Sequence, residues 1–178
     1  MSKKMLYGLG LFLVINLIPH QLLAGDSRFL FQTSIWTHHY QHDPKHNNQQ
    51  ELINIIWYAD SSYHPQFLAD YQDSWVRDIH WFIGGSTFKN SYSQRTYYGY
   101  IGGRYNLPIT HPHLQPYGQV TAGLIHGYKG KYQDKVAFND YGTAPAFIPS
   151  IGLDYRRFNM ELVAFSGSGV MLNAGFYF

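Results

Sequence analysis

The last nine residues of the chain alternate regularly between two kinds of side chain. One face carries Val170, Leu172, Ala174, Phe176 and Phe178, and the other carries Met171, Asn173, Gly175 and Tyr177. Successive side chains of a β-strand point to opposite faces, so this period of two predicts a strand. The segment therefore favours a sheet fold whose last strand has one strongly apolar face and finishes on an aromatic residue.

The composition extends this prediction to the rest of the chain. Aromatic residues make up 18% of the sequence, with 16 Tyr, and 17 residues are Gly, whereas only 13% are charged. No stretch after residue 24 is apolar and uncharged over the ~18 residues that a helical membrane span requires. The chain also has no cysteine, so disulfides cannot stabilise it. This mixture suits many short strands whose outer face meets a medium less polar than water.

Residues 1–24 have the pattern of an export signal. Lys3 and Lys4 precede the apolar run 6–18, and Ala24 supplies a small residue for cleavage. Removing this segment takes away two lysines and leaves 11 basic and 11 acidic residues in 25–178, which we expect to form a single domain. A formally neutral domain gives no electrostatic reason to expect nucleic acid as a partner.

Eight strand candidates alternate with turns, and eight is the smallest strand count of the transmembrane barrels known from bacterial outer membranes. They are 29–41, 51–59, 78–88, 95–106, 114–127, 145–155, 157–165 and 170–178. The sequence therefore predicts an all-β fold, an eight-stranded antiparallel transmembrane β-barrel of the bacterial outer membrane, present as a monomer. A soluble periplasmic β-sandwich is the alternative.

The connections divide into two sets. If the N-terminus lies in the periplasm, the outer connections are 42–50, 89–94, 128–144 and 166–169, and the inner turns include 107–113 and the turn at Arg156. The connection 60–77 is too long for a tight inner turn. It is a protruding loop, a surface helix from Pro65 to Trp75, or a sign that the strand register is wrong.

Alternation assigns faces to the fourth and fifth strands. The predicted lipid face carries Tyr97, Ile101, Tyr105, Val120, Ala122 and Leu124, and the predicted lumenal face carries Thr96, Tyr98, Tyr100, Gly102, Arg104, Gln119, Thr121 and Gly123. Gly102 has no side chain, so we expect it to leave part of the lumen unfilled; a glycine in a strand marks a close approach of the backbone or the path of a ligand, although a simple bend is more common.

Ser91 lies in the polar turn between the third and fourth strands, and the first strand ends on His38 and His39 at the same rim. A neutral imidazole within hydrogen-bond reach can remove the proton of a serine that attacks a carbonyl. A solvated turn residue is the more common role for such a serine. The four histidines His38, His39, His42 and His46 suggest a metal site or a solvated histidine-rich loop, and we favour the loop.

Several short motifs resemble those of the PagP-type lipid A palmitoyltransferases. Residues 88–92, Phe-Lys-Asn-Ser-Tyr, resemble the family's Phe-Lys-Asp-Ser-Trp, and residues 34–39 resemble its first-strand Ile-Thr-Trp-His. Residues 121–124 resemble its Thr-Ala-Gly-Val run. Pro145 and Pro149 match a proline-flanked strand that opens the barrel wall to lipid in that family.

The resemblance implies an enzyme that moves a palmitoyl group from the sn-1 position of a glycerophospholipid to lipid A, with no metal or soluble cofactor. Family function depends on a rim His, Asp and Ser. Ser91 matches the serine, and His38 or His39 matches the histidine, because the alignment leaves one extra residue. Asn90 stands in place of the aspartate, so it only positions its neighbours or Asp43 substitutes for the missing acid.

The resemblance also suggests substrate contacts. Gly102 falls where the family has a lumenal glycine that sets acyl-chain length, and Tyr98 lines the same lumen. Lys89 and Arg95 lie where they could meet the phosphates of lipid A, or they are simply solvated.

Three functions remain open. A transferase predicts an acyl-sized lumen with His38 or His39 near Ser91. A non-enzymatic barrel, serving as an adhesin or surface-stabilising protein, predicts a lumen filled with interlocked side chains. A deacylase barrel usually carries a His-x-Ser element, and none is present in this sequence.

Overall fold

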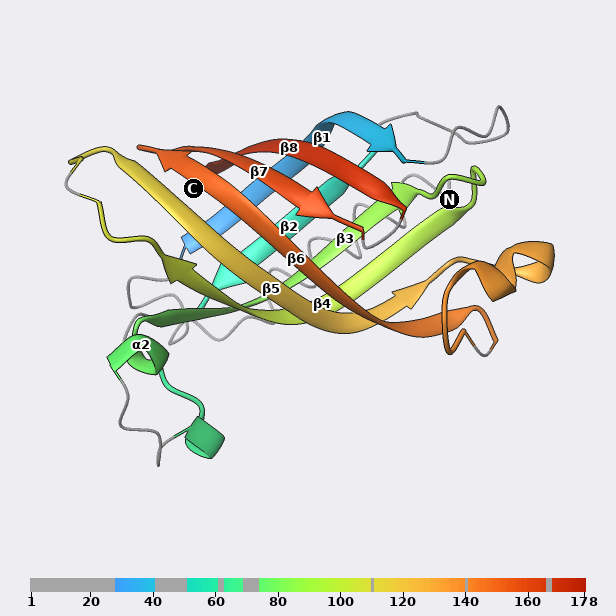
Figure 1. Ribbon diagram of the computed structural model, residues 1–178, viewed down its shortest axis with the longest axis horizontal. Coiled ribbons are helices and arrows are strands. Elements are labelled where there is room, and N and C mark those ends of the chain that lie inside the picture. The colour runs from blue at the N-terminus through green and yellow to red at the C-terminus, as the bar shows by residue number, and fades with distance from the viewer. Residues whose placement is uncertain are drawn as a thin grey trace, which may run out of the picture.

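The computed structural model describes residues 28–40, 51–60, 63–68, 74–109, 111–139, 141–165 and 168–178. Eight antiparallel strands close into a barrel in which each strand pairs with the next and β1 pairs with β8 (Figure 1). The strands are β1 (Arg28–His39), β2 (Ile53–Tyr58), β3 (Ile79–Lys89), β4 (Arg95–Asn106), β5 (Leu114–His126), β6 (Thr143–Tyr155), β7 (Phe158–Ala164) and β8 (Gly169–Tyr177). The predicted eight-stranded barrel is confirmed. The proposed export signal, 1–24, lies outside the described residues.

Alternating burial follows from the alternating sequence. In β4, Tyr97 and Ile101 are 55% and 60% exposed, whereas Thr96, Tyr98 and Arg104 are buried in the lumen. In β5 the same alternation exposes Val120, Ala122 and Leu124 and buries Gln119 and Thr121. The face assignment read from these two strands is therefore confirmed.

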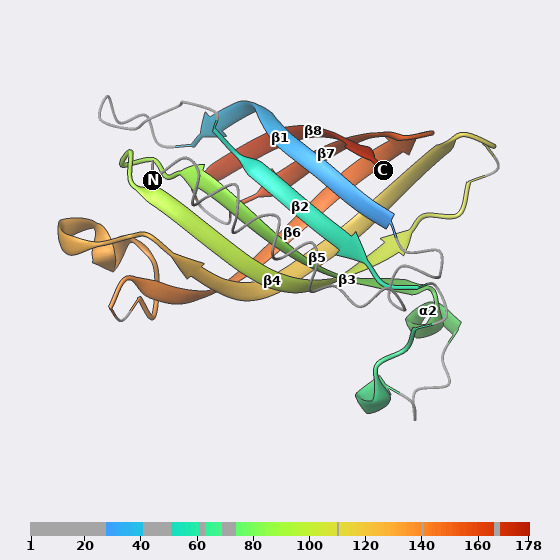
Figure 2. The ribbon, with the colours of Figure 1, turned by 180° about the vertical axis from the view of Figure 1, so that it is seen from behind.

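The two ends of the barrel carry different connections, as both views show (Figures 1 and 2). One end carries the β3–β4 turn, the loop 127–142 with its short 3₁₀ helix η3 (Gly130–Lys135), and the β7–β8 turn; we call it the loop end. We call the opposite end, where the chain finishes at Phe178, the turn end. The strand ends that flank the odd-to-even connections lie together at the loop end, as predicted, and the connection 42–50 itself lies outside the described residues.

The long connection between β2 and β3 lies at the turn end. It contains a 3₁₀ helix, η2 (Gln66–Leu68), and one helical turn, α2 (Ser74–Arg77), beside the barrel (Figure 1). The pairing of β2 with β3 runs without a shift from Ile53 opposite Thr87 to Tyr58 opposite Phe82, so the register was not in error. The connection is a protruding segment. A single helix from Pro65 to Trp75 remains a prediction, because 69–73 lie outside the described residues.

The ladders differ in length. Among the described residues, the ladder of β1 with β2 covers Arg28–Thr33, and that of β6 with β7 covers Ser150–Tyr155. β6 therefore continues from Thr143 to Pro149 beyond its ladder with β7. Pro145 and Pro149 in this part also lack the N–H that a ladder needs. This extension lies in the loop half of the wall.

The turn half of the lumen is densely filled. Arg104 forms an ion pair with Asp154 at 2.6 Å, and its guanidinium lies 3.7 Å from the ring centre of Tyr117. The hydroxyl of Tyr177, from the last strand, accepts a hydrogen bond from Arg104 at 2.8 Å. These contacts join β4, β5, β6 and β8 across the lumen. Among the described residues, no helix has the length and apolar character needed to cross a membrane.

Candidate functional site

A β-bulge in the first strand decides which histidine faces the lumen. The pairing of β1 with β8 shifts between Ser34, opposite Asn173, and Trp36, opposite Leu172, so Ile35 is an extra residue. Leu30, Gln32 and Ser34 are buried before the bulge, whereas Trp36 is 46% exposed after it. A bulge of one residue exchanges the two faces of the strand that follows.

His38 therefore lies on the outer face and His39 on the lumenal face. The ring of His38 stacks on Trp36 with 5.7 Å between centroids and an interplanar angle of 6°. His39 pairs with the buried Gly169 and is itself half-buried. Of the two candidates, His39 is the one on the lumenal face, and which of them acts as a base stays a prediction. Because the two rings point to opposite faces of one strand, they cannot share a metal ion.

Ser91 sits at the tip of the β3–β4 hairpin, as predicted, and Asn90 builds that hairpin. The Oδ1 atom of Asn90 accepts hydrogen bonds from the backbone N–H groups of Tyr92 and Gln94, both at 3.0 Å. Asn90 is only 2% exposed, and its Nδ2 has no hydrogen-bond partner among the described residues. The side chain therefore holds the turn together, and whether it also orients a catalytic group stays a prediction.

Lys89 and Arg95 flank the hairpin and share one carboxylate. Lys89 Nζ lies 2.6 Å from Glu51 Oε1, and Arg95 Nη2 lies 3.3 Å from Glu51 Oε2. The hydrogen bond from Lys89 holds the pKa of Glu51 below its usual range. Both cations lie at the loop end, where the sequence predicts a phosphate contact, but one of their two charges is balanced by Glu51.

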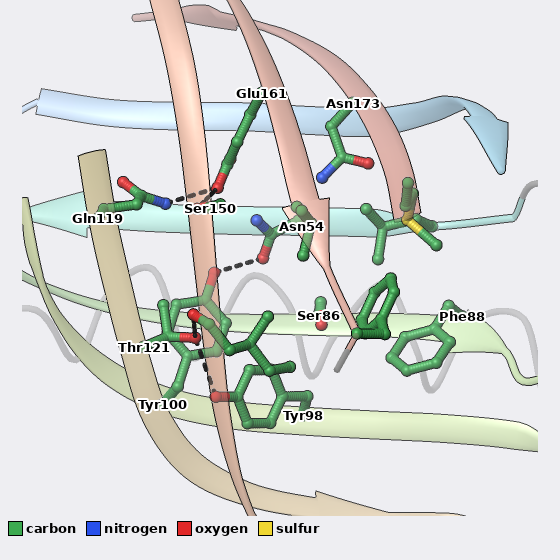
Figure 3. A pocket seen from close by; sticks show the side chains of 15 residues that line it. Asn54, Ser86, Phe88, Tyr98, Tyr100, Gln119, Thr121, Ser150, Glu161 and Asn173 are labelled. Atoms are coloured by element: carbon green, nitrogen blue, oxygen red, sulfur yellow. Dashed lines mark hydrogen bonds between the residues drawn. The ribbon is translucent and has the colours of Figure 1, made fainter. Parts of the chain in front are cut away.

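A cavity of about 60 Å³ lies in the loop half of the lumen (Figure 3). Its lining combines six apolar side chains, which we call the apolar collar, with polar ones: the collar is Leu52, Phe88, Ile148, Val163, Phe165 and Met171, and the polar lining includes Asn54, Gln119, Thr121, Ser150, Glu161 and Asn173. Ligand pockets usually measure ~300–1,000 Å³, so the free space is smaller than the acyl-sized lumen that a transferase predicts. The collar side chains occupy the difference.

Two tyrosines cross the lumen beneath the cavity. Tyr100 Oη donates a hydrogen bond to Asn54 Oδ1 at 2.6 Å, and Tyr98 Oη lies 3.0 Å from Thr121 Oγ1 (Figure 3). Glu161 accepts hydrogen bonds from Gln32, Gln119 and Ser150, so its carboxylate is enclosed by donors. Sequence reasoning placed Tyr98 and Tyr100 in the lumen but missed Asn54 and Glu161. The sequence feature that could have identified these two residues is a polar side chain at a lumenal position of a strand.

Gly102 does not leave the lumen open, and that expectation was wrong. A methyl group at Gly102 would overlap the ring of Phe82, which lies opposite Gly102 on the neighbouring strand β3. Phe82 is 3% exposed and packs against Tyr58 with 5.2 Å between ring centroids. Gly102 is needed for the close approach of this ring, so the missing side chain is replaced by a neighbour and not by a ligand path.

An aromatic cluster at the loop end was also missed by sequence reasoning. Tyr92 stacks on Tyr132 with 4.0 Å between ring centroids and meets Tyr128 edge-on at 6.5 Å. Burial raises the pKa of Tyr128 to about 12. The cluster packs the loop 127–142 against the hairpin that carries Ser91, so the hairpin is supported from β5 and β6 as well as from its own turn.

Metal ligation finds no support in the part of the chain that the structure describes, which contains no cluster of three candidate ligands. His42, His46 and Asp43 lie outside that part. The structure thus brings His39, Asn90, Ser91, Lys89 and Arg95 to one end of the barrel, with Tyr98 deeper in the lumen and Gly102 below it.

No family model matches the sequence, and no curated protein matches it. Among solved structures, the chain is similar to the N-terminal β-barrel domain of Pseudomonas aeruginosa OprF, with a TM-score of 0.39 and 14% identity over 86% of this chain and 98% of that chain. This likeness is too distant to bear on function, and it bears neither for nor against the resemblance to the PagP-type enzymes.

Proposed function

We propose that the protein is a monomeric barrel of the bacterial outer membrane. The outer face of the wall is apolar over neighbouring strands, with exposures of 49% for Ile83, 60% for Ile101, 61% for Leu124 and 70% for Phe147. Soluble monomers rarely expose contiguous apolar surface on this scale, whereas lipid-facing strands require it. Aromatic side chains gather at the turn end, where Phe29 stacks with Trp57 and Phe178. A closed barrel has no free sheet edge that would need a partner.

We further propose that this barrel transfers an acyl chain from a glycerophospholipid to lipid A. The observation that carries the proposal is the bulge at Ile35, which turns His39 into the lumen at the end where Ser91 lies. Ser91 Oγ bonds to the ester carbonyl carbon while His39 takes its proton. The ester C–O bond breaks, and the lysophospholipid leaves with that proton. A lipid A hydroxyl then attacks the acyl-serine, and its proton passes through His39 to Ser91 Oγ.

The extension of β6 beyond its ladder supports a membrane substrate. β6 continues from Thr143 to Pro149 beyond its ladder with β7, and Pro145 and Pro149 lack the N–H that a ladder needs. An acyl chain that enters from the bilayer at this place breaks none of the described hydrogen bonds between β6 and β7. This part of β6 carries Ile148, which lines the cavity.

A non-enzymatic barrel is the second candidate, and one observation favours it. The turn half of the lumen is filled by interlocked side chains around Arg104, which is what that function predicts for the whole lumen. The loop half does not fit the non-enzymatic function, because a collar of six apolar side chains surrounds the cavity there.

Mass spectrometry of lipid A separates the two candidates. We expect lipid A from cells that express the chain to gain one acyl group, and the gain to disappear with Ser91→Ala and with His39→Ala. His38→Ala is the matched control, because it removes the same side chain from the outer face of the same strand. Unchanged lipid A with the folded wild-type barrel in the outer membrane would establish the non-enzymatic function, and loss of an acyl group would indicate a deacylase.

A further inference from the structure

We propose that the loop 127–142 anchors the loop end of the barrel in the adjacent lipid leaflet, with Phe138 and Tyr141 at the boundary between headgroups and acyl chains. The inference rests on the proposed location of the barrel in the outer membrane and does not depend on acyl transfer. It assigns a lipid surface as the partner of this loop.

Phe138 and Tyr141 expose their aromatic rings almost completely. Phe138 is 82% exposed and Tyr141 is 96% exposed, more than any other large hydrophobic side chain that the structure describes. A single exposed apolar residue needs no explanation, but two bulky aromatic ones only three positions apart indicate a contact surface. Aromatic side chains, tyrosine in particular, are enriched at membrane interfaces, where an apolar ring and a polar tip are both accommodated.

The backbone holds both residues in a conformation that bulky side chains rarely adopt. The φ angles of Phe138 and Tyr141 are both 57°, in the left-handed region. This conformation is unfavourable for residues with a Cβ and persists only where the surrounding structure enforces it. The loop therefore imposes the outward display of these two rings.

Asn139, next to Phe138 in the sequence, is the residue that enforces this display. Its side chain is 8% exposed, and its Nδ2 donates to the backbone carbonyls of Tyr128 at 2.8 Å and Gln133 at 2.9 Å. The side chain of Gln133 donates back to the carbonyl of Asn139 at 2.8 Å. Because Asn139 is fixed on the inside of the loop, Phe138 and Tyr141 remain on its outside.

The loop is itself fixed to the barrel. Gln94, in the β3–β4 hairpin, donates from Nε2 to the carbonyl of Lys129 at 3.2 Å and accepts from the N–H of Lys129 at 3.1 Å. The N–H of Gly127 donates to the carbonyl of Gly142 at 3.0 Å and closes the base of the loop. A loop that is ordered in advance loses little conformational entropy when its side chains enter a lipid surface.

The base of the loop adjoins the apolar outer wall. Tyr141 is two residues from Thr143, the first residue of β6, so its Cα lies within about 7 Å of that of Thr143. The outer wall below it carries Phe147 of β6, which is 70% exposed, and Leu124 of β5, which is 61% exposed. The segment after η3 lies on the side of the β5–β6 hairpin away from β1 and β8 (Figures 1 and 2). The exposed rings thus continue the surface that faces lipid.

The length of β6 places these rings at the level of the lipid headgroups. The strand has 13 residues and ends at Tyr155, at the turn end. This length corresponds to about 40 Å along the strand and about 30 Å along the axis of a barrel whose strands tilt by about 40°. The hydrocarbon core of a bilayer is also about 30 Å thick. Residues just beyond Thr143 therefore lie where the hydrocarbon ends.

Lys129 supplies a cation beside the rings. A methyl group at Gly142 would lie 3.0 Å from Cγ and 3.4 Å from Cε of Lys129, so the stem of this exposed lysine runs next to Tyr141 along the base of the loop. Such a stem can lie along an apolar surface while its ammonium reaches the phosphates. Two aromatic rings with an adjacent cation fit a lipid surface better than a purely apolar partner.

Site-directed spin labelling in vesicles of phosphatidylcholine and phosphatidylglycerol tests this placement. The chain has no cysteine, so Phe138→Cys and Tyr141→Cys each give the purified full-length barrel a single nitroxide. The measurement compares collision with oxygen, which dissolves in the bilayer, and with a water-soluble nickel complex. We expect both labels about 5–10 Å below the phosphates. Leu124→Cys is the reference for the lipid-facing wall, and Asp134→Cys, on η3, is the reference for water.

The outcomes separate the anchor from the membrane location. Labels of Phe138→Cys and Tyr141→Cys that meet the nickel complex as readily as that of Asp134→Cys overturn the inference, and labels shielded from both reagents overturn it in favour of a protein contact. A Leu124→Cys label in water instead overturns the proposed membrane location.

A second pair of variants tests how the loop displays its rings. Asn139→Ala should release the label of Tyr141→Cys into water, whereas Asp134→Ala, on the exposed part of the same loop, should leave it in the lipid. A label that stays at the same depth in both variants contradicts the role of Asn139 in holding the anchor.

Discussion

The two halves of the lumen differ in what fills them and in how their walls are joined. In the turn half, Arg104 binds Asp154 and Tyr177, and all eight strand pairs are hydrogen-bonded. In the loop half, an apolar collar surrounds a cavity and β6 extends past its ladder with β7. We expect the turn half to contribute more to the stability of the barrel than the loop half does. Stability and the candidate chemistry are thus assigned to opposite ends of one barrel.

Removing the buried ion pair of the turn half should give the largest loss of stability. Arg104→Ala leaves the carboxylate of Asp154 without its ion-pair partner, and the two side chains are only 6% and 13% exposed. Removing one partner of a buried pair costs about 3–5 kcal/mol. Unfolding in urea from phospholipid vesicles should show this loss, while Lys131→Ala, a change on the exposed η3 segment, should stay within about 0.5 kcal/mol. A stable Arg104→Ala barrel that has lost transfer activity would contradict the division between the halves.

Exchanging the faces of His38 and His39 should give the next largest loss of transfer activity. Two single-residue deletions in β1 test this, one that exchanges the faces and one that keeps them. Deleting Thr37 puts His38 on the lumenal face and His39 on the outer face, so transfer should fall by about 10²-fold, as expected for loss of a general base. Deleting Ile35 removes only the bulged residue and keeps the faces of all that follow.

The Ile35 deletion is therefore the matched control, and its transfer rate should stay within a factor of a few of wild type. Lipid A mass spectrometry on the two deletions gives the comparison. If both deletions have the same activity, the orientation of His39 is not what the reaction depends on, and the bulge is only a bend in the wall.

Substitutions of Asn90 test whether the hairpin is stabilised by the hydrogen bonds that this side chain accepts. Asn90→Ala removes the acceptor of two backbone N–H groups in a buried turn and should cost about 1–2 kcal/mol. Asn90→Asp keeps that acceptor and should fold with near wild-type stability. Thermal unfolding followed by circular dichroism measures both. An Asn90→Ala barrel as stable as wild type would contradict the structural role of this side chain.

Much of this fold could be predicted because its signals are local. The period of two in β4, β5 and β8, with turn residues between strands, predicts the number of strands, their faces and the end at which Ser91 lies. The hairpin tip follows from Asn90 and Ser91 for the same reason. These features depend on neighbours within a few residues, which a single sequence displays.

The missed features depend on contacts between distant strands. The bulge at Ile35 exists only in the pairing of β1 with β8, and nothing in β1 alone marks the extra residue. Gly102 seemed to leave a space, but Phe82 from another strand fills it. The bridge from Tyr100 to Asn54 joins residues 46 positions apart. Alternation can place a side chain in a lumen, but it cannot tell which opposing side chain meets it there.

The smallest expected effect concerns the charges at the loop rim. Glu51 has a depressed pKa, chiefly through the hydrogen bond from Lys89, so it stabilises the fold above its ordinary pKa of 4.5 and loses this contribution as the pH falls through the depressed value. The group is exposed, so the loss should be small and should shrink further in high salt. Thermal unfolding between pH 6 and about pH 3 should show a slightly weaker decline for Glu51→Gln than for wild type. Equal declines would mean that the bridge to Lys89 and Arg95 adds nothing to stability.

The same variant, Glu51→Gln, also tests a role of these charges in activity. If it accelerates transfer to lipid A, both cations bind the phosphates of lipid A once the carboxylate is neutral, and the charges at the rim take part in the reaction at the loop end.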